Sequence, residues 1–360
     1  MNGRIFLLCL LVYVPLFQSC RKEQDPKKLK NSVVLIRTQF VFKVAFSKDL
    51  VFYFNELDDA QGIKGGLDGL LGKDDAYARP NEMYGTGFFI GKDGKIATNR
   101  HVVEGLTKTA VSNIINKLKI QMALIEAQIA GKEQQVSAQI SRLEYEQQAY
   151  DYDNSADIAT LQGQLLKVQQ TKSIVDVLRS ATTDSHDIQV TTEILDLGIA
   201  MNNTYINKAS DFIGCVLLKI AEKDGVDLAI IQTKDKKLPA GIKTFFKVPK
   251  IVKLKVREGD EVMIIGYNRG LSIGNTSEGL KVQQLEGKIS QVTDDVKMQY
   301  DISTLPGSSG SPVFNKAGRL IAVNFAGIDG SQLKYGIHIK HLADLLKDLS
   351  SDSDDSEEDE

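Results

Sequence analysis

Cysteine is scarce in this chain, and its scarcity limits the redox chemistry open to the protein. The 360 residues include three cysteines. Cys9 and Cys20 lie within or just after an apolar N-terminal segment, so Cys215 alone is left for the rest of the chain. We therefore expect no disulfide within the mature chain. Cys215 lies between a glycine and the apolar run 216–218, which predicts a small buried side chain and not a nucleophile.

A large excess of charge is also missing. The formal net charge is −3, and seven of the acidic residues fall within 350–360. Without these seven acids the net charge would be +4, so the body of the protein is near neutral and we expect no nucleic-acid partner. The segment 350–360 contains only Ser, Asp and Glu, which predicts a disordered, solvated tail. The sequence predicts neither a cofactor nor a metal site.

The apolar run at the N-terminus is too short to span a membrane comfortably. Residues 5–17, preceded by Arg4, have the length of a signal peptide, and a serine and then Cys20 follow shortly after. This arrangement resembles a bacterial lipoprotein signal. The resemblance implies a signal over 1–19, a lipid on Cys20, and an exported protein anchored to a membrane of the bacterial cell envelope. The residues just before the serine depart from the usual motif, so cleavage elsewhere or an uncleaved anchor stays open.

The feature most suggestive of chemistry is a turn rich in glycine and serine at 304–314. Gly307 and Gly310 bracket Ser308 and Ser309, and apolar runs lie on both sides of the turn. Glycines allow a tight turn that exposes the Ser309 hydroxyl and directs backbone N–H groups into the same space. A nucleophile and an oxyanion hole could share such a loop. A plain turn without chemistry is the alternative.

A histidine and an aspartate occupy similar positions at strand ends. The segment 85–103 contains two short strands around a Lys-Asp-Gly turn, and His101 follows the second strand. Asp227 begins the apolar strand 227–231, where a partly buried acid requires a hydrogen-bond donor. Asp224 is the competing acid, but it falls in the preceding turn, where Asp is common for backbone reasons.

Most of the chain predicts short β-strands. Strand-like composition recurs at 32–38, 40–46, 188–205, 212–220, 261–267, 282–292, 296–300, 319–325 and 333–339. Turns separate these runs at short intervals. With 42% hydrophobic and 25% charged residues, the chain can bury one or two cores. The pattern indicates a mainly β protein built as a barrel or a sandwich.

A different periodicity begins near residue 108. Apolar residues repeat every seven positions, which predicts a coiled-coil helix of about 60 Å over 111–150. They are Ile115, Met122, Ile129, Val136, Leu143 and Tyr150. A second, shorter helix follows, with Ile158, Leu161, Leu165, Val168, Val175 and Leu178 on one face. We expect a helical hairpin, inserted over 108–180. The unmatched part of the first helix could pair with another copy of the protein, pack on its own domain, or be turned back by a kink at Gly131.

The order His101, Asp227, Ser309 and the motifs around these residues resemble those of trypsin-fold serine proteases. The matching motifs are Gly-Thr-Gly-Phe-Phe-Ile at 85–90, Thr-Asn-Arg-His-Val-Val at 98–103, Asp-Leu-Ala-Ile-Ile at 227–231 and Gly-Ser-Ser-Gly-Ser-Pro at 307–312. The resemblance is to the bacterial HtrA-like group and related trypsin-like peptidases, and it covers most of 32–347 outside the helical insertion.

The resemblance implies two six-stranded β-barrels of trypsin type and a serine endopeptidase. His101 would be the general base, Asp227 would orient it, and Ser309 would attack the peptide carbonyl to form an acyl-enzyme. The N–H groups of Gly307 and Ser309 would form the oxyanion hole. A polypeptide would be the substrate.

Alignment to the family also implies a specificity pocket. Ser303 would lie at its base, and Asn324, Phe325 and Ala326 would lie along its wall. Since no acid lines the pocket, we expect a small or medium apolar residue before the cleaved bond rather than Lys or Arg. His338 and His341 match no motif of the family and are expected to be structural.

Several features depart from the family pattern. No PDZ-like domain follows the protease region, and Ser308 occupies the position of an aspartate that takes part in N-terminal activation in digestive relatives. The expected organisation is a signal at 1–19, a linker at 20–31, a protease domain at 32–349 with the insertion 108–180, and the acidic tail 350–360. A role in envelope protein quality control or processing is the favoured function. A catalytically silent scaffold that assembles through its coiled coil is the alternative.

Overall fold

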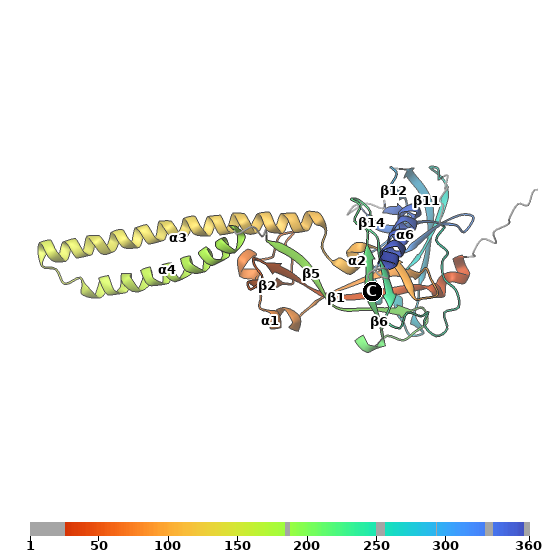
Figure 1. The fold of residues 1–360 in the computed structure, drawn as a ribbon, viewed down its shortest axis with the longest axis horizontal. Helices are drawn as coiled ribbons and strands as arrows, with labels where there is room; N and C mark the ends of the chain where they lie inside the picture. Colours follow the sequence, from red (N-terminus) through yellow and green to blue (C-terminus); the bar gives the residue numbers. More distant parts are fainter. Residues whose placement is uncertain (1–25, 184–187, 250–255, 293, 328–333, 356–360) are drawn as a thin grey trace, which may run out of the picture.

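The chain forms two β-barrels and a long helical hairpin that projects away from them (Figure 1). The structure is a computed structural model, and it describes residues 26–183, 188–249, 256–292, 294–327 and 334–355. Both barrels are antiparallel, and each closes with six strands. The expected mainly β fold, with a helical segment inserted in the first barrel, is confirmed.

The first barrel is closed by pairing its first strand with two others. In order around the barrel its strands are β1 (Val33–Ala45), β3 (Asn81–Phe89), β4 (Lys95–Thr98), β7 (Ala229–Thr233), β6 (Ile213–Ile220) and β5 (Gln189–Met201). Strand β5 pairs with β6 on one side and with β1 on the other, and the pairing with β1 closes the barrel. A short strand, β2 (Val51–Phe54), pairs with the far end of β1 beyond the barrel.

The second barrel is built from the C-terminal half of the chain. Its strands, in order around the barrel, are β11 (Gln283–Val292), β12 (Lys297–Tyr300), β15 (Lys334–His338), β14 (Leu320–Gly327), β13 (Pro312–Asn315) and β8 (Glu261–Gly266). A minor ladder pairs β9 (Asn275–Thr276) with β10 (Gly279–Leu280).

Short helices connect or flank the strands. They are η1 (Pro26–Ser32), η2 (Gly66–Gly69), α1 (Lys73–Ala78), α2 (Arg100–Glu104), η3 (Ala209–Asp211), α5 (Leu271–Gly274) and the C-terminal α6 (Ile339–Asp355). Within the described residues, none of the helices combines the length and the apolar character that a membrane crossing requires.

A shared hydrophobic core holds the two barrels together. Successive residues of a strand face opposite sides, so Val33 and Leu35 of β1 enter this shared core while Val34 packs in a separate cluster of the first barrel. The second barrel contributes Ile265 and Phe314 to the same core. All five side chains are fully or almost fully buried. The junction between the barrels is therefore a packed interface with fixed geometry, and the candidate site lies at this junction.

One long strand replaces two predicted ones. The segments 32–38 and 40–46 were expected as separate strands, but β1 is continuous across them. Arg37, close to the junction of the two segments, is buried and donates to Glu82 at 2.7 Å and to Asp196 at 2.9 Å. Because neighbouring strands supply partners for the charge, the polar residues stay within the sheet.

The helical hairpin consists of α3 (Lys108–Tyr150) and α4 (Ser155–Thr183). At 1.5 Å per residue α3 is about 65 Å long, and Figure 1 shows the two helices side by side, extending far from the barrels. The predicted face of α4 is buried or half-buried throughout. In α3 the seven-residue pattern is buried at Met122, Ile129 and Val136, whereas Tyr150 at its end is exposed.

The base of α3 packs on the first barrel, in a cluster that Leu178 of α4 also joins. Near the barrel the buried positions of α3 shift to Ala110, Ile114 and Leu118, which contact a cluster that includes Phe40 and Phe54. The unmatched part of the first helix is thus covered by its own domain. Packing on its own domain is the alternative that the structure adopts for this segment.

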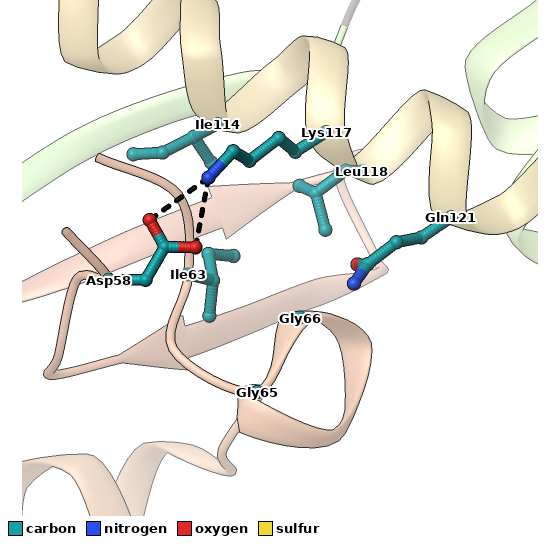
Figure 2. Close-up of a pocket in the computed structure, with 8 residues that line it drawn as sticks. All are labelled: Asp58, Ile63, Gly65, Gly66, Ile114, Lys117, Leu118 and Gln121. Atoms are coloured by element: carbon teal, nitrogen blue, oxygen red, sulfur yellow. Dashed lines mark hydrogen bonds and ion pairs between the residues drawn. The ribbon is translucent and has the colours of Figure 1, made fainter. Parts of the chain in front are cut away.

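A pocket lies where α3 crosses the loop that follows β2 (Figure 2). Lys117 Nζ is 2.9 Å from both carboxylate oxygens of Asp58, and the Gln121 amide packs against Gly66. The pocket has a volume of about 210 Å³, and Leu118 forms part of its apolar wall. Polar and apolar contacts therefore both join the hairpin to the barrel.

Both ends of the described chain differ from expectation. Helix η1 occupies part of the expected linker, and Leu29 within it is buried in the shared core, so packing begins before residue 32. The expectation of disorder from residue 350 is wrong for 350–355, because α6 continues to Asp355. Buried Leu342 and Leu345 hold the start of α6, and extending an existing helix costs little. Residues 1–25, with the predicted signal and Cys20, and residues 356–360 lie outside the described residues.

Candidate active site

His101 lies in the short helix α2 directly after β4. Its Nδ1 is 2.5 Å from Asp227 Oδ2, and its backbone N–H donates to Asp227 Oδ1 over 3.0 Å. An ionised carboxylate only accepts hydrogen bonds, so Nδ1 carries the proton and donates it. The other ring nitrogen, Nε2, is then left as a proton acceptor. Asp227 thus fixes both the orientation and the tautomer of the imidazole.

Asp227 is held in place through its backbone as well as its carboxylate. It lies just before β7, and the buried Asn99 side chain donates from Nδ2 to the Asp227 carbonyl at 2.7 Å. Asn99 is also the residue that precedes α2, so one side chain ties the aspartate to the helix of the histidine. The competing acid, Asp224, is exposed and pairs instead with Lys108 at 2.6 Å.

The two side chains are partly shielded from water. His101 is 29% exposed and Asp227 is 20% exposed. A charge-assisted bond in such a setting is stronger than one at the open surface. The pair can therefore stabilise an imidazolium when the ring takes up a second proton.

Ser309 lies in the turn before β13, between the buried residues Ser308 and Gly310. Its hydroxyl has no hydrogen-bond partner among the residues that the structure describes, His101 included. Catalytic hydrogen bonds are often long in unliganded enzymes and tighten with substrate, so this geometry is compatible with a serine that His101 activates.

Two backbone N–H groups of the turn have no acceptor among the described residues. The Pro306 carbonyl accepts from Arg269 N–H at 2.6 Å, and the Ser308 carbonyl accepts from Ser311 N–H at 3.1 Å. The Pro306 carbonyl shares a peptide with the Gly307 N–H, and the Ser308 carbonyl shares one with the Ser309 N–H. Because a trans peptide places N–H opposite C=O, the N–H groups of Gly307 and Ser309 point away from the groups that bond these carbonyls. Among the described residues, nothing accepts from either N–H. An oxyanion could therefore bind both.

Buried side chains strengthen these anchors. Ser311 Oγ donates to the Ser308 carbonyl at 2.6 Å, and Asn324 Nδ2 donates to the same oxygen at 2.9 Å. Thr86 Oγ1 donates to the Gly307 carbonyl at 2.8 Å, and Thr86 N–H donates to the Ser309 carbonyl at 2.7 Å. The conformation of the turn is thus fixed on both sides of Ser309.

Gly307 and Gly310 have backbone conformations that the turn requires. Their φ angles are +97° and +87°, in the left-handed region that disfavours residues with a Cβ. A Cβ on Gly310 would also lie 2.0 Å from the Thr86 carbonyl oxygen. The sequence signal of two glycines around the serine therefore has a direct steric cause.

The residues expected at the specificity pocket have different environments. Ser303 is exposed, Phe325 is half-buried, and Asn324 is 1% exposed. The Asn324 amide is bonded to the serine turn, and its Oδ1 accepts from Tyr300 Oη at 2.6 Å. Its side chain therefore supports the turn. Ala326 lies in β14, and its side chain is outside the described set.

His338, His341 and Cys215 are half-buried or buried. Burial lowers the pKa values of His338 and His341, and His341 Nε2 lies 3.1 Å from the Asp295 carbonyl oxygen. Burial raises the pKa of Cys215 to about 12, which keeps the thiol protonated and unreactive at neutral pH. No cluster of potential metal ligands occurs in the described part of the chain.

Sequence reasoning missed the supporting residues Asn99 and Thr86. A signal existed for each of them. Asn99 directly precedes the helix of His101, and Thr86 lies between two glycines of a strand, where a polar residue must find a buried partner. The folded structure is needed to show that Asn99 bonds to Asp227 within the first barrel and that Thr86 bonds to Gly307 across the two barrels.

Comparison with known proteins agrees with this geometry. A sequence model described as the trypsin-like peptidase domain matches residues 176–323, a span that contains Asp227 and Ser309. Residues 176–323 are therefore similar to a trypsin-like peptidase domain. The enzyme class of the chain is accordingly that of the serine endopeptidases. The matched span begins within α4 and does not include His101.

Solved structures of bacterial proteases are also similar to the chain. The active form of the Rv3671c protease from M. tuberculosis is 12% identical with a TM-score of 0.41, covering 90% of this chain and 83% of that one. An inactive variant of that protein gives 11% identity and a TM-score of 0.39, covering 90% and 89%. The serine endoprotease from Yersinia pestis is 13% identical with a TM-score of 0.42, covering 91% of this chain and 65% of that one. Similarity at this level adds no argument to the family match.

Proposed function

We propose that this protein hydrolyses peptide bonds through a triad of His101, Asp227 and Ser309. The observation that carries the proposal is the pair of hydrogen bonds that the Asp227 carboxylate accepts from His101, one from the ring and one from the backbone. The serine turn adds two N–H groups that have no acceptor among the described residues. The trypsin-like peptidase match over 176–323 supports the same reaction class.

Each residue of the triad has one role in the proposed reaction. His101 Nε2 takes the proton of the Ser309 hydroxyl as Oγ attacks the carbonyl carbon of the substrate. Asp227 stabilises the imidazolium through Nδ1 and does not itself accept the proton. The N–H groups of Gly307 and Ser309 bind the resulting oxyanion, a contribution of about 3–4 kcal/mol for each donor.

The second half of the reaction returns the enzyme to its starting state. The imidazolium gives its proton to the leaving amine, the carbon–nitrogen bond breaks, and an acyl group remains on Ser309 Oγ. Water then enters, loses a proton to His101 Nε2, and attacks the acyl carbon. The carboxylic acid product leaves, and Ser309 recovers its proton.

The cellular setting is part of the same proposal. The N-terminal segment, with Cys20 at its end, supports an exported lipoprotein of the bacterial envelope, where the enzyme would act in protein quality control or processing. The exposed parts of the hairpin leave room for self-association through α3 and α4. A small or medium apolar residue is the proposed preference before the cleaved bond.

Hydrolysis of an unfolded protein by matched variants tests the catalytic proposal. The wild type and a Ser290→Ala variant, which loses a serine on β11, should cleave at the same rate. Ser309→Ala and His101→Ala should lose activity while retaining the wild-type circular dichroism spectrum. Equal activity in Ser309→Ala would exclude the triad. Profiling of the cleaved sites tests the specificity, and a preference for Lys or Arg would contradict it.

A further inference from the structure

Thr86 is a buried residue of β3 at the junction of the two barrels. It lies between Gly85 and Gly87, and its side chain is fully buried. Its strand belongs to the first barrel, but its hydroxyl and its backbone N–H bond to loops of the second barrel.

Four hydrogen bonds converge on Thr86. Its Oγ1 donates to the Gly307 carbonyl at 2.8 Å and accepts from Tyr267 N–H at 3.0 Å. Its backbone N–H donates to the Ser309 carbonyl at 2.7 Å, and its carbonyl accepts from Thr98 Oγ1 at 2.8 Å. The single hydroxyl therefore connects the turn that carries Ser309 with the loop that begins at Tyr267.

We propose that the Thr86 hydroxyl is a positioning group for the oxyanion hole, an inference that rests on the proposed function. It acts through Gly307, whose N–H is one of the two oxyanion donors. It does not touch the substrate, so Thr86 is a positioning residue and not a catalytic one.

The conformation of Gly307 explains why such a group is needed. A glycine has no Cβ to restrict its backbone, so its φ of +97° must be held by hydrogen bonds at its two peptides. Thr86 Oγ1 holds the carbonyl on one side of Gly307. On the other side, the Pro306 carbonyl is held by Arg269 N–H.

The same hydroxyl also supports the second anchor. Arg269 lies in the loop that starts at Tyr267, and the Tyr267 N–H is bonded to Thr86 Oγ1. This loop approaches Gly307 so closely that a Cβ on the glycine would lie 2.6 Å from both Tyr267 O and Gly270 N. Loss of the hydroxyl would therefore leave one buried donor and one buried acceptor unpaired, and would loosen both anchors of the Gly307 N–H.

Three variants separate positioning from packing. Thr86→Val keeps the shape and removes the hydroxyl, whereas Thr86→Ser keeps the hydroxyl and removes a methyl group. Thr233→Val is the matched control, because buried Thr233 Oγ1 likewise donates to a carbonyl and accepts from an N–H, both of Lys237. Thr233 lies at the end of β7 and has no contact with the serine turn.

Steady-state kinetics on a peptide substrate tests the proposal. Removing one oxyanion donor lowers kcat by about 100- to 1000-fold, so displacing one should lower kcat of Thr86→Val by about 10- to 100-fold. KM should stay unchanged. The inhibition constant of a peptide aldehyde, whose adduct with Ser309 presents an oxyanion, should rise by a similar factor. Thr86→Ser should restore kcat, and Thr233→Val should match the wild type.

Failures of the two proposals are distinguishable. If Thr86→Val keeps the wild-type kcat while Ser309→Ala is inactive, the positioning role is wrong and the triad stands. A rise in KM alone, or an equal loss in Thr233→Val, also overturns the positioning role. A wild-type enzyme that cleaves nothing overturns both. If Thr86→Val does not fold, Thr86→Ala is measured in its place. The same changes in kcat and KM then support or overturn the positioning role.

Discussion

The packing of the helical hairpin on the first barrel makes a quantitative prediction for Leu118→Ala. Leu118 is 1% exposed and packs with Phe40 and Ile63 at the base of α3. Buried Leu→Ala substitutions cost about 2–5 kcal/mol, and the cost grows with the cavity that remains. Here the new space joins the existing pocket of about 210 Å³ beside Lys117, which water can enter. We therefore expect the lower part of the range, about 2–3 kcal/mol.

Urea unfolding followed by circular dichroism at the helical band measures this effect. The matched control is Leu124→Ala, because Leu124 lies on the same helix and is 59% exposed. It should change the free energy of unfolding by less than about 0.5 kcal/mol. Equal midpoints for Leu118→Ala and Leu124→Ala would refute the conclusion that the hairpin base is part of the core.

Three further predictions concern the site and the core. Asp227→Asn should fold normally but lower kcat by about 10,000-fold, since the histidine loses its orienting charge; unchanged kcat would contradict the assigned role. Gly310→Ala should lower the free energy of unfolding in urea by about 3 kcal/mol, because its Cβ would clash with the Thr86 carbonyl. Gly259 has a similar φ but open space around it, so Gly259→Ala should lower the free energy of unfolding by about 1 kcal/mol. Burial raises the pKa of the Cys215 thiol from 9.0 to about 12, so the stability that the protonated thiol contributes is complete below pH 9 and is lost between pH 9 and 12. In Cys215→Ala the free energy of unfolding should therefore decline less steeply between pH 9 and 12. An unchanged slope would show that burial of Cys215 does not cause the decline.

Much of the architecture could be predicted from the sequence, because periodicity reports which face of an element is buried. The strands of both barrels and the two long helices lie close to the expected ranges. Periodicity does not report what covers a face. It could not show that the base of α3 packs on β1, nor that Arg37 finds acidic partners on both neighbouring strands and keeps β1 continuous.

The candidate site was predictable in its principal residues and not in its supports. His101, Asp227 and Ser309 each lie in a short motif with a chemical reason for its residues. Thr86 acts on the serine turn through a contact between the two barrels, and Asn324 acts on it from β14 within the second barrel. Asn324 illustrates the difference, since alignment placed it along a pocket and the structure bonds its amide to Ser308.

The central claim is that Ser309 is the nucleophile, and covalent labelling with a fluorophosphonate tests it most directly. Mass spectrometry of the labelled and digested protein locates the modified residue. The account predicts one adduct per chain, on Ser309, with none formed in Ser309→Ala or after unfolding in urea. An adduct on Ser308 or Ser311, or no adduct on the folded wild-type protein, would contradict it.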